Sequence, residues 1–269
     1  SSFYIDAVFQ RLGKLDVDES EEAMLGMLGQ LPQLCREDPR FWDRLSNLAF
    51  VKTAAGQLAR PWELYDPSVS ELEDLLQGGE FYPAPSFLKP EYIATLVRLG
   101  LQTSLDRAGI LKVARSIASS LDNGVDPAQV SKRGRSLLTF LARQASALGL
   151  DKPADVDDPL LAQADEAFRE QLRSLAWVPV RQDRPRDDIP WVPGRKVVAA
   201  PNHVRLASDV MYASHSMATC AEEVKSKALC AFLGWCDPVS PVVLALQLVQ
   251  YAAMHGQELA VNPLEQPME

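Results

Sequence analysis

Residues 44–66 read RLSNLAFVKTAAGQLARPWELYD, and this stretch decides the fold because its pattern occurs a second time in the chain. Leu172, Ser174, Leu175, Ala176, Trp177 and Val178 repeat the spacing and character of Leu45, Asn47, Leu48, Ala49, Phe50 and Val51. After a longer loop, Ala199, Pro201 and Val204 correspond to Ala59, Pro61 and Leu64. An internal repeat in a sequence predicts a repeated structural unit, and it is therefore considered before single helices and strands are assigned. The sequence therefore predicts two related halves.

A third correspondence extends the repeat beyond the central stretch. Leu99-Gly100-Leu101 precedes one apolar helical segment, and Leu233-Gly234-Trp235 precedes another. We place the boundary at the Asn123-Gly124 turn, so the predicted halves are residues 1–125 and 126–269. The first half is expected to carry a β-hairpin near 50–59 and the second to carry short strands near 177–206. The predicted fold class is mainly α, of the α+β type, with two related helical halves that each hold a small β-hairpin element.

Helices account for most of the remaining pattern. Apolar residues at helical spacing predict helices over 21–34, 68–77, 90–99, 105–121, 127–148, 159–175, 222–233 and 240–255. Ser104 is the expected N-cap of the helix that begins at 105. Gly56 is expected to supply the positive φ of the hairpin turn.

Composition limits the classes of partner. The 269 residues are 47% hydrophobic, and 27 basic against 36 acidic residues give a net charge of −9. An acidic chain of this kind disfavours nucleic acid and anionic membrane as partners, because both require clustered Lys and Arg. Four dispersed cysteines without a CxxC pair fit free thiols in a reducing cytosol, so we expect a cytoplasmic location.

The sequence carries no recognisable catalytic motif. His203, His215 and His255 are not spaced as metal ligands, and GxGxxG, GxxxxGK[ST] and GxSxG are all absent. The acidic pairs at 157–158 and 187–188 precede proline or fall in loops, where turn and capping roles are common. We predict no catalytic residue, no metal, no cofactor and no ATP binding, and hence no enzymatic activity.

Aromatic residues gather between the predicted elements of the first half. The candidate partner-binding residues are Trp62, Tyr65, Phe81, Tyr82 and Phe87, in segments interrupted by prolines. Rigid aromatic side chains offer large contact area at low entropic cost and could line a groove for a peptide. The alternative is that these rings only fasten irregular loops to the helices, and solvent exposure distinguishes the two.

Several of these motifs resemble those of a known protein family. The run LAFVKTAAGQLARPWELYDP (48–67) resembles the signature of the large internal repeats of the sacsin family. The segments 81–87, 96–105, 110–117, 177–180 and 233–235 continue the resemblance in order. It implies a segment downstream of an ATPase-like module of the GHKL class, within a large cytosolic protein concerned with quality control. It implies as partners other proteins: chaperones, unfolded clients and filament proteins. No catalytic position is carried over.

Three functional hypotheses follow. The first is a non-catalytic scaffold or client-binding segment of a sacsin-like, chaperone-associated protein. The second is an enzyme with a cryptic acid/base site between the halves, which would require convergent buried ionisable groups. The third is an architectural spacer that positions neighbouring modules, which would need neither such a site nor an exposed apolar groove.

Overall fold

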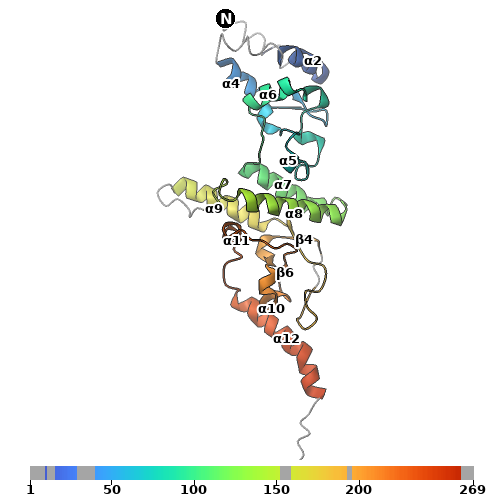
Figure 1. The fold of residues 1–269 in the computed structure, drawn as a ribbon, viewed down its shortest axis with the longest axis vertical. Coiled ribbons are helices and arrows are strands. Elements are labelled where there is room, and N and C mark those ends of the chain that lie inside the picture. Colours follow the sequence, from blue (N-terminus) through green and yellow to red (C-terminus); the bar gives the residue numbers. More distant parts are fainter. Residues whose placement is uncertain (1–9, 11–15, 29–39, 152–158, 193–195, 262–269) are drawn as a thin grey trace, which may run out of the picture. The chain divides into compact units, whose positions relative to one another are not determined.

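The structure is a computed structural model that describes all residues except 1–9, 11–15, 29–39, 152–158, 193–195 and 262–269 (Figure 1). The chain divides into two compact units, Ser1–Leu105 and Asp106–Glu269. Helices dominate both units, and every strand is two residues long. The predicted fold class, mainly α with small β elements, is confirmed.

The first unit alternates short helices with irregular segments. Its described elements are α2 (Val17–Leu28), α4 (Arg40–Ser46), β1 (Val51–Lys52), β2 (Leu58–Ala59), the 3-10 turn η1 (Pro61–Glu63), α5 (Ser70–Glu73), the 3-10 turns η2 (Gly79–Phe81) and η3 (Pro85–Phe87), and α6 (Pro90–Arg98).

The predicted hairpin of the first unit is present. Strands β1 and β2 pair antiparallel, with Val51 opposite Ala59. The turn is closed by Thr53, whose N–H donates to the Gln57 carbonyl over 2.7 Å, and Gly56 has a φ of +83°. Because the hairpin is short, it depends on packing for its stability.

An apolar cluster supports this hairpin. Phe50 and Val51 are fully buried together with Met24 of α2, Leu45 of α4 and Phe87 of η3. The cluster therefore contains residues that precede the hairpin in the sequence and residues that follow it. At about 25 cal/mol per Å² of apolar surface, burying such side chains is the main stabilising contribution.

The second unit contains three longer helices followed by a β-containing region. Its described elements are α7 (Arg107–Ser120), α8 (Pro127–Gln144), α9 (Pro159–Ser174), β3 (Val178–Pro179), β4 (Val198–Ala199), the 3-10 turn η4 (Pro201–His203), β5 (Val204–Arg205), the 3-10 turn η5 (Ala207–Asp209), α10 (Val210–Ala213), β6 (Ala218–Thr219), α11 (Lys227–Phe232) and α12 (Pro241–Val261).

The strands of the second unit form two separate pairs. Strands β3 and β4 pair antiparallel, with Val178 opposite Ala199. Strand β5 pairs in parallel with β6, and Val204 lies opposite Ala218. Sequence analysis expected a strand at 204–206 but did not find its partner at 218–219, because a two-residue strand has no alternating pattern to detect.

Helix α8 supports β3 through a backbone contact. A Cβ placed on Gly134 would lie 2.4 Å from the Trp177 carbonyl oxygen, so only glycine permits this approach. Trp177 is fully buried, and its indole Nε1 donates to the Leu172 carbonyl over 2.9 Å. The burial of Phe50, Val51, Trp177 and Val178 at the helix-to-strand junctions agrees with the sequence pattern.

Several helix ends differ from the prediction. The N-cap of α7 is Asp106, whose Oδ1 accepts from the Gly109 N–H over 2.7 Å, whereas Ser104 was expected. Asp caps a helix as well as Ser does, and the preceding Leu105 is buried outside the helix. Helix α5 covers only four residues, against the ten predicted, and α11 starts at Lys227 because Ser226 caps it.

Along the sequence, the boundary between the compact units falls between residues 105 and 106, whereas the boundary between the predicted halves falls between residues 125 and 126. Helix α7 lies between these two positions and packs on α8 and α9, so it belongs to the second compact unit. Compactness and sequence relatedness are different properties, and the boundary of the predicted halves stays a prediction.

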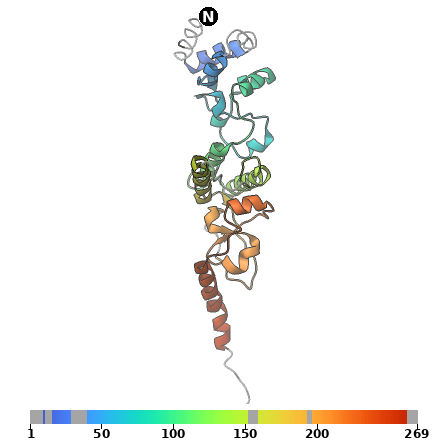
Figure 2. The same ribbon diagram turned by 90° about the vertical axis from the view of Figure 1, so that its left-hand side faces the viewer.

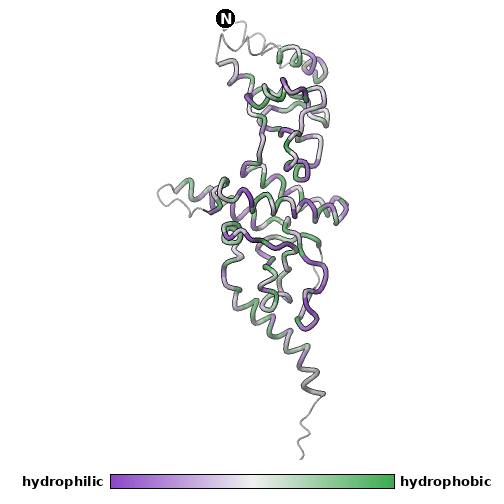
Figure 3. Tube along the Cα trace, viewed as in Figure 1, coloured by the Kyte–Doolittle hydropathy of each residue, from purple (hydrophilic) through white to green (hydrophobic). Residues whose placement is uncertain are grey.

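Helix α12 is attached to its unit through α10 (Figure 2). Figure 3 shows that its residues are largely apolar around the helix axis. In the described part of the chain, no helix has the length and apolar content required to cross a membrane.

Candidate protein-binding site

The five aromatic residues predicted to bind a partner differ sharply in exposure. Tyr65, Phe81 and Phe87 are buried, at 3%, 4% and 0% exposure. Tyr82 is half-buried, and its hydroxyl donates to the Leu72 carbonyl over 3.0 Å. Trp62 is 41% exposed. The structure therefore does not gather the five on one open surface, and Trp62 is the member most available to a partner.

The three buried rings fasten irregular backbone. The Tyr65 N–H donates to the Phe81 carbonyl over 2.9 Å, which joins two segments separated by α5. Phe87 belongs to the apolar cluster that contains Phe50. Burial of large rings stabilises these proline-interrupted segments, which lack regular ladders of their own. These contacts match the fastening role that was the alternative interpretation.

Trp62 is held in a rigid setting although its ring is exposed. It is the central residue of η1, which begins at Pro61. A Cβ placed on Gly100 would lie 3.1 Å from the Trp62 Cβ, so the end of α6 lies directly under the side chain. The Gln102 amide donates to the Trp62 carbonyl over 2.6 Å. Both contacts fix the position from which the ring projects.

Cationic side chains stack on two tryptophans of this unit. The Arg60 guanidinium lies 5.5 Å from the Trp62 ring centroid, and the Arg98 guanidinium lies 4.6 Å from that of Trp42. Arg60 Nε also donates to the Asn47 carbonyl over 3.0 Å, next to the end of α4. These contacts link α4, η1 and the end of α6. Val97, 39% exposed, lies one helical turn before Gly100 on α6.

We call this set the Trp62 surface, and its residues are Trp42, Arg60, Trp62, Val97, Arg98 and Gly100. Sequence analysis singled out Trp62 but not Arg98 or Val97. No local signal relates Arg98 to Trp42, because the contact joins two helices that are distant in sequence. The exposure of Val97 depends on how α6 packs and is likewise not a local sequence signal.

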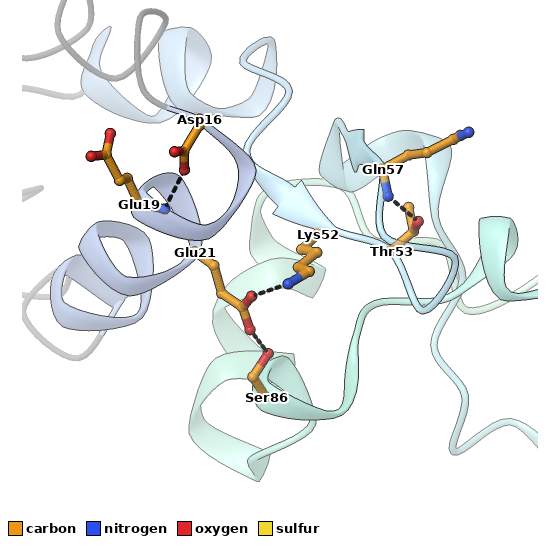
Figure 4. A network of polar contacts seen from close by, with 7 residues as sticks. All are labelled: Asp16, Glu19, Glu21, Lys52, Thr53, Gln57 and Ser86. Atoms are coloured by element: carbon orange, nitrogen blue, oxygen red, sulfur yellow. Dashed lines mark hydrogen bonds and ion pairs between the residues drawn. The ribbon is translucent and has the colours of Figure 1, made fainter.

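A polar network also lies in the first unit (Figure 4). Lys52 Nζ lies 2.8 Å from Glu21 Oε2, and the Ser86 hydroxyl donates to the other oxygen of the same carboxylate. The three residues join α2, β1 and η3. A carboxylate that is already paired with a lysine is a poor base toward the serine, so the geometry fits a fastening contact better than nucleophile activation.

The second unit has a surface cavity of about 520 Å³ between the end of α8 and the segment before α11. Arg143, Glu223 and Lys225 line it and are exposed, and Glu222 pairs with Arg135. These charged side chains face solvent, whereas acid/base catalysis uses convergent buried ionisable groups.

Histidine and cysteine positions give no ligand set in the described residues, where no three His, Cys, Asp or Glu side chains converge as metal ligands would. Cys220 and Cys230 are buried thiols and Cys236 is exposed. Burial raises the pKa of Cys220 from its ordinary 9.0 to about 11, which makes it a weak nucleophile at neutral pH. Cys35 lies outside the described residues.

The fold and the site together define a mainly helical protein with short β pairs and an exposed Trp–Arg surface. The chain is similar to human sacsin, with 28% identity over 174 residues that make up 62% of this chain and 4% of sacsin. No family model matches the chain, and no solved structure matches it. The predicted sacsin-like relationship is therefore confirmed as a distant and partial similarity.

Proposed function

We propose that the chain is a non-catalytic scaffold segment that binds protein partners through the Trp62 surface. The observation that carries the proposal is an exposed tryptophan on a rigid base, stacked with an arginine. Trp and Arg are the residue types most often found as energetic centres of protein interfaces. A rigid ring also loses little side-chain entropy when a partner covers it.

The chemistry of the surface defines the partner. Trp62 and Val97 offer apolar contact, and Arg98 can pair with a carboxylate, whereas Arg60 already pairs with Glu63 over 3.7 Å. An extended segment that carries an apolar side chain next to an acidic one would satisfy both features. Unfolded proteins expose such segments, so the surface suits capture of a non-native client.

The similarity to sacsin supports a proposal for the cellular process in which this partner binding takes place. We propose that the chain works in the cytoplasm in protein quality control, as part of a chaperone-associated protein, with chaperones and filament proteins among its partners. The matched residues make up 4% of sacsin, and the family resemblance implies an ATPase-like module upstream, so an adjoining module of that kind is also part of the proposal. A purely architectural spacer is the competing proposal, and the experiment below separates the two.

The test is capture of a permanently unfolded acidic protein, prepared by reduction and carboxymethylation, by the 269-residue chain. Trp62→Ala should weaken capture about 10- to 30-fold, which corresponds to the loss of a typical interface centre worth about 1.4–2 kcal/mol. The matched control is Tyr212→Ala, because Tyr212 is 55% exposed but belongs to the second unit. It should leave capture unchanged.

Thermal unfolding must accompany the binding measurement. Trp62 is exposed, so Trp62→Ala should leave the melting temperature within a few degrees of the parent chain. Equal capture by the parent and Trp62→Ala would reject the Trp62 surface. No capture by the parent chain at all would favour the spacer.

A further inference from the structure

Helix α12 is attached to its unit by a polar contact, which is unusual for an apolar helix. Its buried side chain near the point of attachment is Gln247, at 4% exposure. The Gln247 carbonyl oxygen accepts from the His215 N–H over 2.8 Å, and its amide donates to the Ser214 hydroxyl over 3.1 Å. Both ends of the amide are satisfied, so this face of α12 is fixed toward α10.

The opposite face of α12 carries exposed apolar residues in a regular series. Val242, Leu246, Val249 and Ala253 are separated by four, three and four residues. The three large members are 68%, 46% and 63% exposed, and Ala253 is also exposed. Alternating intervals of four and three residues place side chains along the contact line of a coiled coil, whose natural partner is another helix with the same spacing. We call these four residues the α12 seam.

The absence of charge on most of α12 permits an identical helix as its partner. No Asp, Glu, Lys or Arg occurs between residues 241 and 257. The positions that flank the seam are therefore neutral, and they can neither select an oppositely charged helix nor repel an identical one. An exposed apolar helix without charge is a feature of interfaces rather than of free surfaces.

We propose that α12 binds the α12 of a second copy of this chain in an antiparallel pair. In that arrangement Val242 lies opposite Ala253 of the second copy, and Leu246 lies opposite Val249. Large side chains then face small ones at both ends of the seam, which fills space better than a parallel pair with alanine opposite alanine. The pair has two-fold symmetry, the commonest symmetry of protein dimers.

The size of the contact sets its strength. The 21 residues of α12 extend about 32 Å. If the helix is treated as a cylinder about 10 Å in diameter, half of its lateral surface, the area of one contacting face, is about 500 Å². Two copies would bury about 1,000 Å², slightly less than the roughly 1,200–2,000 Å² of stable interfaces. We therefore expect a reversible dimer with a dissociation constant on the order of 10 μM.

Sedimentation equilibrium of the 269-residue chain from about 1 μM to about 100 μM tests the dimer, since this range brackets the expected dissociation constant. The parent chain should pass from monomer to dimer. Val249→Glu should stay monomeric, because it places a charge in the middle of an apolar contact. The control is Leu248→Glu, which is off the seam but similarly exposed, at 68% against 63%, and should dimerise like the parent.

The orientation is tested by cross-linking in a chain whose Cys35 and Cys236 are replaced by Ser. Chains with Val242→Cys should form disulfides with chains carrying Ala253→Cys, and neither should do so alone. Cross-linking of Val242→Cys with itself would contradict the antiparallel arrangement. A monomeric parent chain at the highest concentration, or equal loss of dimer in Val249→Glu and Leu248→Glu, would overturn the proposal.

Discussion

The segment around Trp62 in the first unit and the segment around Asn202 in the second share their local backbone but expose different side chains. Each follows an antiparallel strand pair and begins at a proline, Pro61 or Pro201, that opens a 3-10 turn. The next residue is Trp62 in one and Asn202 in the other. Trp62 exposes its ring, whereas Asn202 accepts a hydrogen bond from Arg173 over 3.0 Å.

The neighbouring glycines show the same contrast. Gly100 and Gly234 both end a helix with positive φ, +106° and +77°. Gly100 lies under Trp62, while Gly234 lies against the guanidinium of Arg173. Similar backbones thus present a hydrophobic ring in one unit and a hydrogen-bonded polar pair in the other. Partner binding, as proposed above, would depend on a few exposed side chains and not on the shared backbone.

The largest difference in stability should come from the aromatic residue before each strand pair. Phe50 and Trp177 are both fully buried, but only Trp177 also donates a hydrogen bond, to the Leu172 carbonyl. Either residue changed to Ala should lower the free energy of unfolding by about 3–5 kcal/mol. Trp177→Ala should be the more damaging, because it also leaves a buried carbonyl unpaired.

Urea unfolding followed by circular dichroism measures both variants. Trp177→Phe is the refining control, since it keeps most of the apolar volume and removes only the hydrogen bond, and it should cost about 1–3 kcal/mol. A free energy of unfolding within about 0.5 kcal/mol of the parent for Trp177→Ala would contradict the burial of the ring.

The glycine that contacts the strand pair of the second unit should have a smaller effect on the free energy of unfolding than the two aromatic residues. Strand β3 rests on Gly134 of α8, where an added Cβ would lie 2.4 Å from the Trp177 carbonyl oxygen. Backbone atoms cannot move aside as a flexible side chain can, so Gly134→Ala should cost about 1–3 kcal/mol. The free energy of unfolding from urea titration checks this value.

The control for Gly134→Ala is Gly26→Ala. Gly26 lies in α2, is exposed, and has nothing within 4 Å of an added Cβ. Alanine there should raise the free energy of unfolding by about 0.5–1 kcal/mol, because it removes the entropic cost of glycine in a helix. Opposite signs for the two substitutions would confirm that close packing, and not helix propensity, governs position 134.

Much of this fold was predictable because its signals are local. The 50–59 hairpin and the positions of α8 and α9 follow from turn residues and from apolar spacing over many residues. The pairing of β5 with β6 was not predictable, since each strand has two residues and the partners are joined only in three dimensions.

The candidate site was predictable to a smaller degree. The density of aromatic residues located Trp62, but the same signal selected Tyr65, Phe81 and Phe87, which are buried. Aromatic density does not distinguish a ring that fills a core from one that faces solvent, because both uses favour large side chains. The exposed seam of α12 was not recognised either, since an apolar helix is more often buried.

The smallest expected effect is a dependence of the free energy of unfolding on alkaline pH. It concerns two isolated β-bridges that occupy equivalent positions in the two units. Thr53 bridges to Pro83 in the first unit, and Val180 bridges to Cys220 in the second. Burial raises the pKa of the Cys220 thiol to about 11, whereas proline has no proton to lose. Between pH 9 and 11 the unfolded chain loses this proton while the folded chain keeps it. The folded state therefore binds more protons, and the free energy of unfolding falls as pH rises through this window.

From pH 9 to pH 10 the loss should be about 1 kcal/mol, since a full pKa unit corresponds to about 1.4 kcal/mol. In this narrow range Tyr82, whose pKa is raised to about 12 by burial and by Glu73, adds a smaller loss, because its ordinary pKa is 10.0. Burial also raises the pKa of the Cys230 thiol, so Cys230 adds to the loss in the same range. Urea titrations at the two pH values should show the loss in the parent chain and in Cys236→Ser, which removes an exposed thiol. Cys220→Ala should abolish most of it. If Cys220→Ala retains the full loss, the thiol is not the group responsible, and the second unit does not differ from the first in this respect.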